Sequence, residues 1–171
     1  GPRPNLLDLT SGGKQKRLEV DQPILTNTDL ERIRRIENHV DGSFKTYTLN
    51  ICYRKEASKK TDLENFLTDI CNKAEVAVKT QGYNIIILSD RGVDEDHIAI
   101  PSLLATGAVH HHLINQGLRT EVGIVVETGE AKRVHDICLL AGYGAEAVYP
   151  YLALDAVKML AKDFKHFFLH A

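Results

Sequence analysis

The sequence predicts an α/β fold in which parallel strands alternate with helices, as a small open sheet or a partial, degenerate (β/α) barrel. Two apolar segments, residues 84–88 and 122–126, contain almost no polar position, so both faces of each strand must be covered. Helical patterns lie between the strands along the chain. This alternation favours parallel pairing with right-handed crossovers. Four such units are half of an eightfold barrel, or one small open sheet.

Residues 1–42 are predicted to be an irregular linker with one short helix. Proline and glycine recur through the first 25 residues, with polar residues between them. Thr28 and Glu31 have the spacing of a capping box, which predicts a helix that starts there and runs to about Ile36. Asp41 and Gly42 form a turn signal before the next segment.

Residues 43–171 are predicted to hold the βα repeats. The segment 44–53 is β-branched and aromatic, which is typical of a strand, and Gly82 is suited to end the helix that follows. Pro101 suits the first turn of another helix. The predicted order is strand 44–53, helix from 61, strand 84–88, helix 101–117, strand 122–126, helix 130–140, strand 147–149 and helix 154–168.

Composition excludes several classes of function. A chain of 171 residues fits one domain, and its net charge of −2 gives no electrostatic reason to bind nucleic acid or an anionic membrane. No apolar run approaches the roughly 20 residues of a membrane span. Cys52, Cys71 and Cys138 form no CxxC pair, so we expect buried thiols and a reducing location, the cytoplasm or the plastid stroma.

The chain contains a single methionine, Met159. With no earlier methionine to start translation, we expect position 1 to follow a cleaved tag or to lie inside a longer polypeptide.

Polar residues follow the predicted strands at the point where each strand ends. Asp90 and Arg91 follow the strand at 84–88, Glu127 follows the strand at 122–126, and Tyr151 follows the last strand. Because parallel strands end at one edge of a sheet, these side chains are predicted to form a polar rim. The two carboxylates could bind a metal, a ribose or an amine. Alternatively, Asp90 caps or pairs locally with Arg91, and Glu127 does likewise with a helix N-terminus.

Three consecutive histidines, His110 to His112, lie in the predicted helix 101–117. Adjacent helical positions point about 100° apart, so at most two of these rings can face one site, and no second histidine lies at i+4. We therefore predict no metal site and expect a polar helix face that packs on the rim or on another domain. The chain also has no GxGxxG, GxxxxGK[ST] or GxSxG pattern, so the residues alone predict neither a cofactor site nor a catalytic residue.

Longer stretches of the sequence, taken in order, resemble one known family, the central domain of the glutamate synthase large chain. The resemblance covers nearly the whole chain and is carried by these segments: PILTN at 23–27, ILSDR at 87–91, IPSLLA at 100–105, GAVHHHLI at 107–114, GLRT at 117–120, VETGEA at 126–131, GYGA at 142–145 and PYLA at 150–153.

The resemblance implies one part of a larger enzyme that makes two glutamates from glutamine and 2-oxoglutarate. In that family an amidotransferase domain with an N-terminal cysteine releases ammonia, which travels through a tunnel to an FMN-binding (β/α)8 domain with an iron–sulfur cluster. The central domain joins these two partners and carries neither FMN nor the nucleophile. Here position 1 is Gly1 and the cysteine-rich cluster motif is missing, so we expect no independent catalysis. Tyr149 also stands where an asparagine is common in relatives.

Two hypotheses follow. In the first, the chain is an interdomain module whose rim contacts neighbouring domains and helps to wall off a passage for ammonia. Its candidate contact residues are Asp90, Arg91, His110, His111, Glu127 and Tyr151. In the second, the chain is a free-standing α/β domain that binds a small molecule or a metal through Asp90, Glu127 and the histidines.

Overall fold

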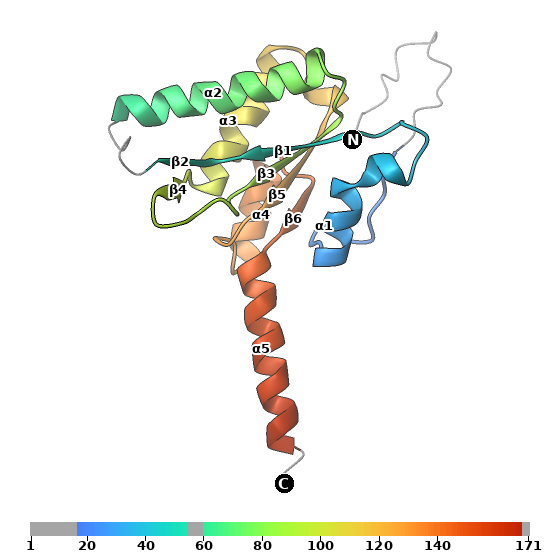
Figure 1. The fold of residues 1–171 in the computed structure, drawn as a ribbon, viewed down its shortest axis with the longest axis vertical. Coiled ribbons are helices and arrows are strands. Elements are labelled where there is room, and N and C mark those ends of the chain that lie inside the picture. The colour runs from blue at the N-terminus through green and yellow to red at the C-terminus, as the bar shows by residue number, and fades with distance from the viewer. Residues whose placement is uncertain (1–16, 55–59, 169–171) are drawn as a thin grey trace.

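The computed structural model describes residues 17–54 and 60–168 (Figure 1). Its elements, in chain order, are α1 (Asn27–Arg34), the 3-10 helix η1 (Ile36–Asn38), β1 (Thr46–Asn50), β2 (Cys52–Arg54), α2 (Lys60–Lys79), β3 (Ile85–Ser89), β4 (His97–Ala99), α3 (Ser102–Asn115), the 3-10 helix η3 (Arg119–Glu121), β5 (Gly123–Glu127), α4 (Val134–Gly142), β6 (Ala147–Tyr149) and α5 (Tyr151–Phe168).

Four strands form one parallel sheet in the order β1-β3-β5-β6, which confirms the predicted α/β class. Each strand lies beside the next strand of this sheet along the chain, as in part of a barrel, and the sheet does not close. The outer edge of β6 is covered by the segment before α1. There the Leu25 amide donates to the Val148 carbonyl at 2.9 Å, and the Val148 amide donates to Pro23 at 2.7 Å.

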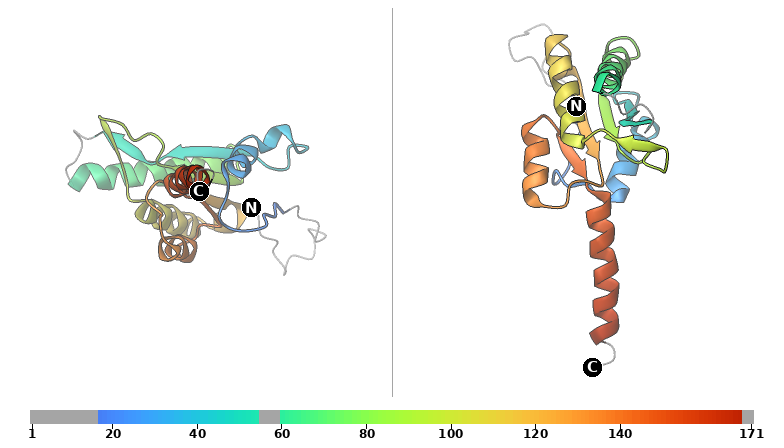
Figure 2. Two further views of the ribbon diagram at one scale, coloured as in Figure 1. Left: turned by 90° about the horizontal axis from the view of Figure 1, so that it is seen from below. Right: turned by 90° about the vertical axis from the view of Figure 1, so that its left-hand side faces the viewer.

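The two faces of the sheet belong to two different cores. Ile86 and Leu88 point to one face and pack in a cluster with residues of α2, α3 and α4. Ile85 and Ile87 point to the opposite face and pack with Leu30 and other residues of α1 and the segments beside it. Because side chains alternate along a strand, cover on both faces buries every residue of β3, which explains its unbroken apolar run. Figure 2 shows α1 lying apart from α3 and α4 across the sheet.

The predicted strand 44–53 is two strands in two sheets. β1 joins the parallel sheet, whereas β2 pairs antiparallel with β4 in a two-stranded sheet that the sequence analysis did not predict. Ile51 connects the two sheets, because its amide donates to the Ser89 carbonyl at 3.0 Å and its carbonyl accepts from the Ile100 amide at 2.9 Å. The β4 segment follows a polar loop and has no strong strand pattern of its own.

The predicted start of the first helix is wrong by two residues. Thr26, not Thr28, is the N-cap: its Oγ1 accepts from the Asp29 amide at 3.3 Å, and Asp29 Oδ2 accepts from the Thr26 amide at 3.0 Å. The same capping-box spacing therefore occurs one half-turn earlier, with aspartate as the second member. Glu31 instead pairs with Arg34 Nε at 3.2 Å.

Of the other helix boundaries, one follows its predicted signal and one lies three residues earlier than predicted. Gly82 adopts the left-handed conformation, with φ of 73°, after the end of α2. The helix predicted from 154 starts earlier, at Tyr151, because the Leu154 amide already donates to the Pro150 carbonyl at 3.1 Å. Among the described residues, no helix combines the length and the apolar character needed to cross a membrane.

Candidate functional site

The candidate site lies at the carboxyl edge of the parallel sheet. Ser89 is the last residue of β3, Glu127 is the last residue of β5, and the register pairs them side by side. Asp90 follows immediately. Asp90 and Glu127 are both buried, each with an exposed fraction of 3%. Two carboxylates buried in one place are stable only if donors or counter-charges surround them.

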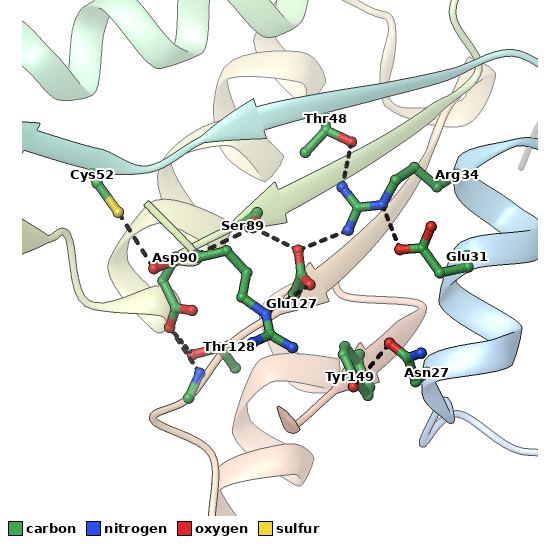
Figure 3. A network of polar contacts seen from close by, with 12 residues as sticks. Asn27, Glu31, Arg34, Thr48, Cys52, Ser89, Asp90, Glu127, Thr128 and Tyr149 are labelled. Atoms are coloured by element: carbon green, nitrogen blue, oxygen red, sulfur yellow. Dashed lines mark hydrogen bonds and ion pairs between the residues drawn. The ribbon is translucent and has the colours of Figure 1, made fainter. Parts of the chain in front are cut away.

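Glu127 is the centre of a polar cluster that joins three parts of the chain (Figure 3). Its Oε2 accepts from Ser89 Oγ at 2.6 Å and from Arg34 Nη2 at 2.9 Å. Its Oε1 accepts from Arg91 Nε at 3.2 Å. Two guanidinium groups thus neutralise one buried carboxylate. Arg34 also donates through Nη1 to Thr48 Oγ1 at 3.2 Å, so it ties α1 to both β1 and β5.

Asp90 makes a separate set of contacts, chiefly with the loop after β5. Its Oδ2 accepts from Thr128 Oγ1 at 2.7 Å and from the Gly129 amide at 2.9 Å. Its backbone carbonyl accepts from Cys52 Sγ at 3.5 Å (Figure 3). Burial, and then the nearby Asp90 charge, raise the pKa of the Cys52 thiol, which therefore stays protonated at neutral pH. The local Asp90–Arg91 ion pair considered from the sequence does not form, because Arg91 pairs with Glu127.

Tyr151, the first residue of α5, completes the cluster. The Arg91 guanidinium lies 3.7 Å from the centre of the Tyr151 ring, which is a close cation–π contact. Burial, together with hydrogen bonding to Asp90, raises the pKa of the Tyr151 phenol to about 12. The phenol therefore remains a hydrogen-bond donor at neutral pH. Four of the six candidate residues, Asp90, Arg91, Glu127 and Tyr151, lie together at this edge.

His110 and His111 do not lie at this edge. Helix α3 begins near the carboxyl edge and runs back along the sheet, so His110 lies more than two turns away from the start of the helix. Its Nδ1 accepts from Arg119 Nε at 2.8 Å, and Arg119 donates to the Val122 carbonyl at 2.7 Å, just before β5 begins. His110 is therefore at the amino edge of the sheet. His111 is exposed beside it, with the two rings 5.3 Å apart.

The arrangement of these side chains stabilises the fold and leaves few ligand atoms available to a metal ion. Among the residues that the structure describes, no group of three His, Cys, Asp or Glu side chains converges as metal ligands would. The Glu127 oxygens already accept from three donors, two of them cationic, which opposes a further cation. The positive group at this edge is Arg91. Its side chain is 47% exposed, and the buried Glu127 carboxylate holds its guanidinium in place.

At the starts of α3 and α4, near this edge, the backbone amides are not free to bind the phosphate of a flavin nucleotide. Such a phosphate needs free backbone amides at a helix start. The Ser102 amide at the start of α3 already donates to Glu130 Oε2 at 2.7 Å. The Arg133 amide before α4 donates to Asp136 Oδ2 at 3.0 Å, and hydrogen bonding from the Arg133 side chain lowers the pKa of Asp136 well below its usual value. Side-chain carboxylates thus occupy both positions.

Fold and site together define a partial βα domain in which the buried Glu127 pairs with two partly exposed arginines at the carboxyl edge of the sheet. Comparison with known proteins then gives the family. The chain matches the family model of the glutamate synthase central domain over residues 1–167, and it belongs to that family.

The relatives are much longer than this chain. It is 36% identical over 166 residues to the NADH glutamate synthase of Schizosaccharomyces pombe, covering 95% of this chain and 8% of that protein. It is 39% identical to the NADPH glutamate synthase large chain of Bacillus subtilis, covering 84% of this chain and 9% of that protein. For the ferredoxin-dependent glutamate synthase of Pyropia yezoensis the identity is 34%, with 92% and 10% covered. The chain thus spans about a tenth of each relative.

The sequence did not reveal Arg34, which pairs with Glu127 at the centre of the site. Arg34 lies in α1, 93 residues before Glu127, and no local pattern marks it. The only available signal was the need for a counter-charge beside two carboxylates predicted to be near each other. Thr128, which donates to Asp90, was likewise missed as a contact.

Proposed function

We propose that this chain is the central interdomain module of a glutamate synthase. It connects an amidotransferase domain to an FMN-binding synthase domain, helps to channel ammonia between them, and has no catalytic activity alone. The observation that carries the proposal is the family match over nearly the whole chain, with relatives about ten times as long. The whole enzyme would convert glutamine and 2-oxoglutarate into two glutamates, using two electrons from a nicotinamide or ferredoxin. FMN and the iron–sulfur cluster would belong to the other domain.

The site supports a connecting role. Both carboxylates are buried, and the two Glu127 oxygens and Asp90 Oδ2 accept from neighbouring donors, so these carboxylates hold other groups of the domain in place. Arg91 and Arg34 are partly exposed at the same edge, with 47% and 29% of the side chain accessible. Exposed guanidinium groups fixed by a buried carboxylate are suited to pair with acidic side chains of a neighbouring domain. Asp90, Glu127 and Tyr151 would act as positioning residues for that contact.

Rigidity is what a connecting module needs. Arg34 fastens α1 to the sheet, and Tyr151 fastens the start of α5 to the same edge. A wall around a passage must also exclude water, since ammonia that reaches solvent is protonated and lost as ammonium. His111, exposed at the amino edge, is a candidate contact for a domain on that side.

The test is to restore activity to a relative from which the matching segment has been removed, by adding this chain. The amidotransferase and synthase domains of the Bacillus subtilis large chain are produced without their central segment and mixed with this chain. We expect glutamine-dependent glutamate formation to rise while ammonia-dependent formation changes little, because only the transfer of ammonia depends on the connection. The Arg91→Ala variant should weaken the effect, and Arg54→Ala, which changes an exposed arginine on β2, should not.

Three results would contradict the proposal. They are glutaminase activity of the chain alone, purification of the chain with a bound flavin, and no binding to either domain of the relative. Stoichiometric zinc or manganese that is lost in Glu127→Gln would support the small-molecule or metal-binding hypothesis in its place.

A further inference from the structure

A small cavity lies between the start of α3, helix α4 and the loop before α4, and none of its lining residues belongs to the cluster around Glu127. Its volume is about 210 Å³. Drug-sized ligands occupy cavities of roughly 300–1,000 Å³, so a molecule that binds here has to be smaller. The lining includes Ser102, Leu103, Glu130, Ala131, Leu139 and Leu140.

Much of the surface of this cavity is apolar. Ala131 and Leu140 are each 2% exposed and belong to the core that contains residues of α2, α3 and α4, and Leu103 packs against the same core. Leu139 also lines the cavity and is 37% exposed. An apolar group bound here would remove part of this surface from water, which is favourable.

Ser102 brings an unused hydroxyl group to the cavity. This residue is 4% exposed. Its amide donates to Glu130 Oε2 at 2.7 Å, and its carbonyl accepts from Thr106 Oγ1 at 2.7 Å. The hydroxyl itself has no hydrogen-bond partner within residues 17–54 and 60–168. Because buried hydroxyl groups normally have a partner, this oxygen marks a position for a polar atom of a ligand.

The cavity has an excess of negative charge. Arg133 and Asp136 line it and neutralise each other, because Arg133 Nη2 and Nε donate to the two Asp136 oxygens at 2.8 and 3.3 Å. Glu130 has no such counter-charge in the described part of the chain. Its Oε2 accepts from the Ser102 amide, and its Oε1 accepts no hydrogen bond from a described residue. The start of α3 offsets part of the Glu130 charge, and the remainder favours a positively charged ligand.

We propose that this cavity binds a small primary amine with a short apolar body. The ammonium group pairs with Glu130 Oε1 and donates to the hydroxyl oxygen of Ser102, the residue whose amide contacts the same carboxylate. An ammonium group carries three donors and no acceptor, so two oxygens that can accept suit it. The apolar body packs on Leu103 and Leu140. A carboxylate or phosphate ligand would meet Glu130 as a like charge. The proposal does not depend on the glutamate synthase role.

The test is a titration of the isotope-labelled chain with n-butylammonium chloride, followed through the backbone amide chemical shifts in NMR spectra at constant ionic strength. We expect saturable shifts centred on Ser102, Leu103 and Ala131, with a dissociation constant on the order of 1 mM for so small a ligand. The alcohol n-butanol has the same apolar body without the charge and should bind about tenfold more weakly, and sodium butyrate should not bind. Equal binding of the amine and the alcohol overturns the proposal, as does the absence of saturable shifts at these amides.

Two variants test the proposed contacts in the same titration. Glu130→Gln keeps an oxygen that can accept from the Ser102 amide but removes the charge, and it should weaken butylammonium binding about tenfold. Ser102→Ala removes only the unused hydroxyl and should weaken binding about threefold.

The control for these variants is Glu64→Gln, which makes the same change of charge at an exposed position of α2 and should bind the amine like the wild type. Unchanged binding in Glu130→Gln, or an equal loss in Glu64→Gln, overturns the proposal. Unchanged binding in Ser102→Ala overturns it as well, and this variant decides the question if Glu130→Gln does not fold.

Discussion

Glu127 and Arg34 lie 2.9 Å apart at the carboxyl edge of the sheet, although 93 residues separate them in the chain. The carboxylate ends β5 and the guanidinium ends α1, so this ion pair fixes the N-terminal helix against the sheet. Because Glu127 is buried, removal of its charge takes away the ion-pair partner of Arg91 and leaves Arg34 paired with Glu31 alone.

We expect Glu127→Gln to lower the free energy of unfolding by about 2 kcal/mol. Breaking a buried pair costs roughly 3–5 kcal/mol, and the partial exposure of Arg34 and Arg91 reduces this. Urea denaturation measures the change. The control is Glu121→Gln, which alters an exposed glutamate in η3 and should stay within about 0.5 kcal/mol of the wild type. Equal losses in the two variants would show that the cluster contributes no special stability.

Gly144→Ala should be severely destabilising, by about 2 kcal/mol or more. Gly144 has φ of 112°, where a side chain is strained, and an added Cβ would overlap the His110 ring. Gly142→Ala is the matched control, since a Cβ there meets nothing within 4 Å and its φ is not in the left-handed region. Thermal denaturation of both variants compares them. A Gly144→Ala protein as stable as Gly142→Ala would contradict the placement of His110 at the amino edge.

Thr26→Ala should cost about 1 kcal/mol of stability, whereas Thr28→Ala should cost less than about 0.5 kcal/mol. Thr26 caps α1 through its hydroxyl, and Thr28 is an exposed residue within the helix. Urea denaturation of the two variants distinguishes the observed cap from the one predicted from the sequence. A larger loss in Thr28→Ala would restore the original prediction.

Stability should fall at high pH through Tyr151. Burial and Asp90 raise the pKa of this phenol from 10 to about 12, so the native state holds the proton more tightly than the unfolded chain does. The resulting stabilisation is complete below pH 10 and is lost as pH rises from 10 to 12. After allowance for solvent screening it amounts to about 1 kcal/mol.

The contribution of Tyr151 is measured as the difference in urea stability between wild type and Tyr151→Phe across this pH range. The difference should shrink as pH rises. Tyr143→Phe, which alters an exposed phenol, should keep the wild-type pH dependence. A constant difference between wild type and Tyr151→Phe would show that folding does not raise the pKa of the Tyr151 phenol.

The sequence by itself determined the class of fold and most of its elements. The apolar segments around Ile86 and Ile124 had to be covered on both faces. Side chains of a strand alternate between its two faces, so an unbroken apolar run indicates a parallel sheet covered on both sides. The rule that parallel strands end at one edge also brought Asp90, Arg91, Glu127 and Tyr151 together correctly as neighbours. Both inferences use only local pattern and the direction of the chain, which the sequence contains.

Only the tertiary structure decided which partners these residues have. Arg34 reaches Glu127 because α1 packs across the sheet, and nothing near Arg34 in the chain indicates that contact. The histidines lie at the opposite edge because α3 runs back along the sheet, which spacing within the helix does not reveal. The β2–β4 pair brings together segments more than 40 residues apart, and Ile51 links it to the parallel sheet. Each of these features arises from contacts between segments distant in the chain, whose free energy is set by packing and burial and not by local preference.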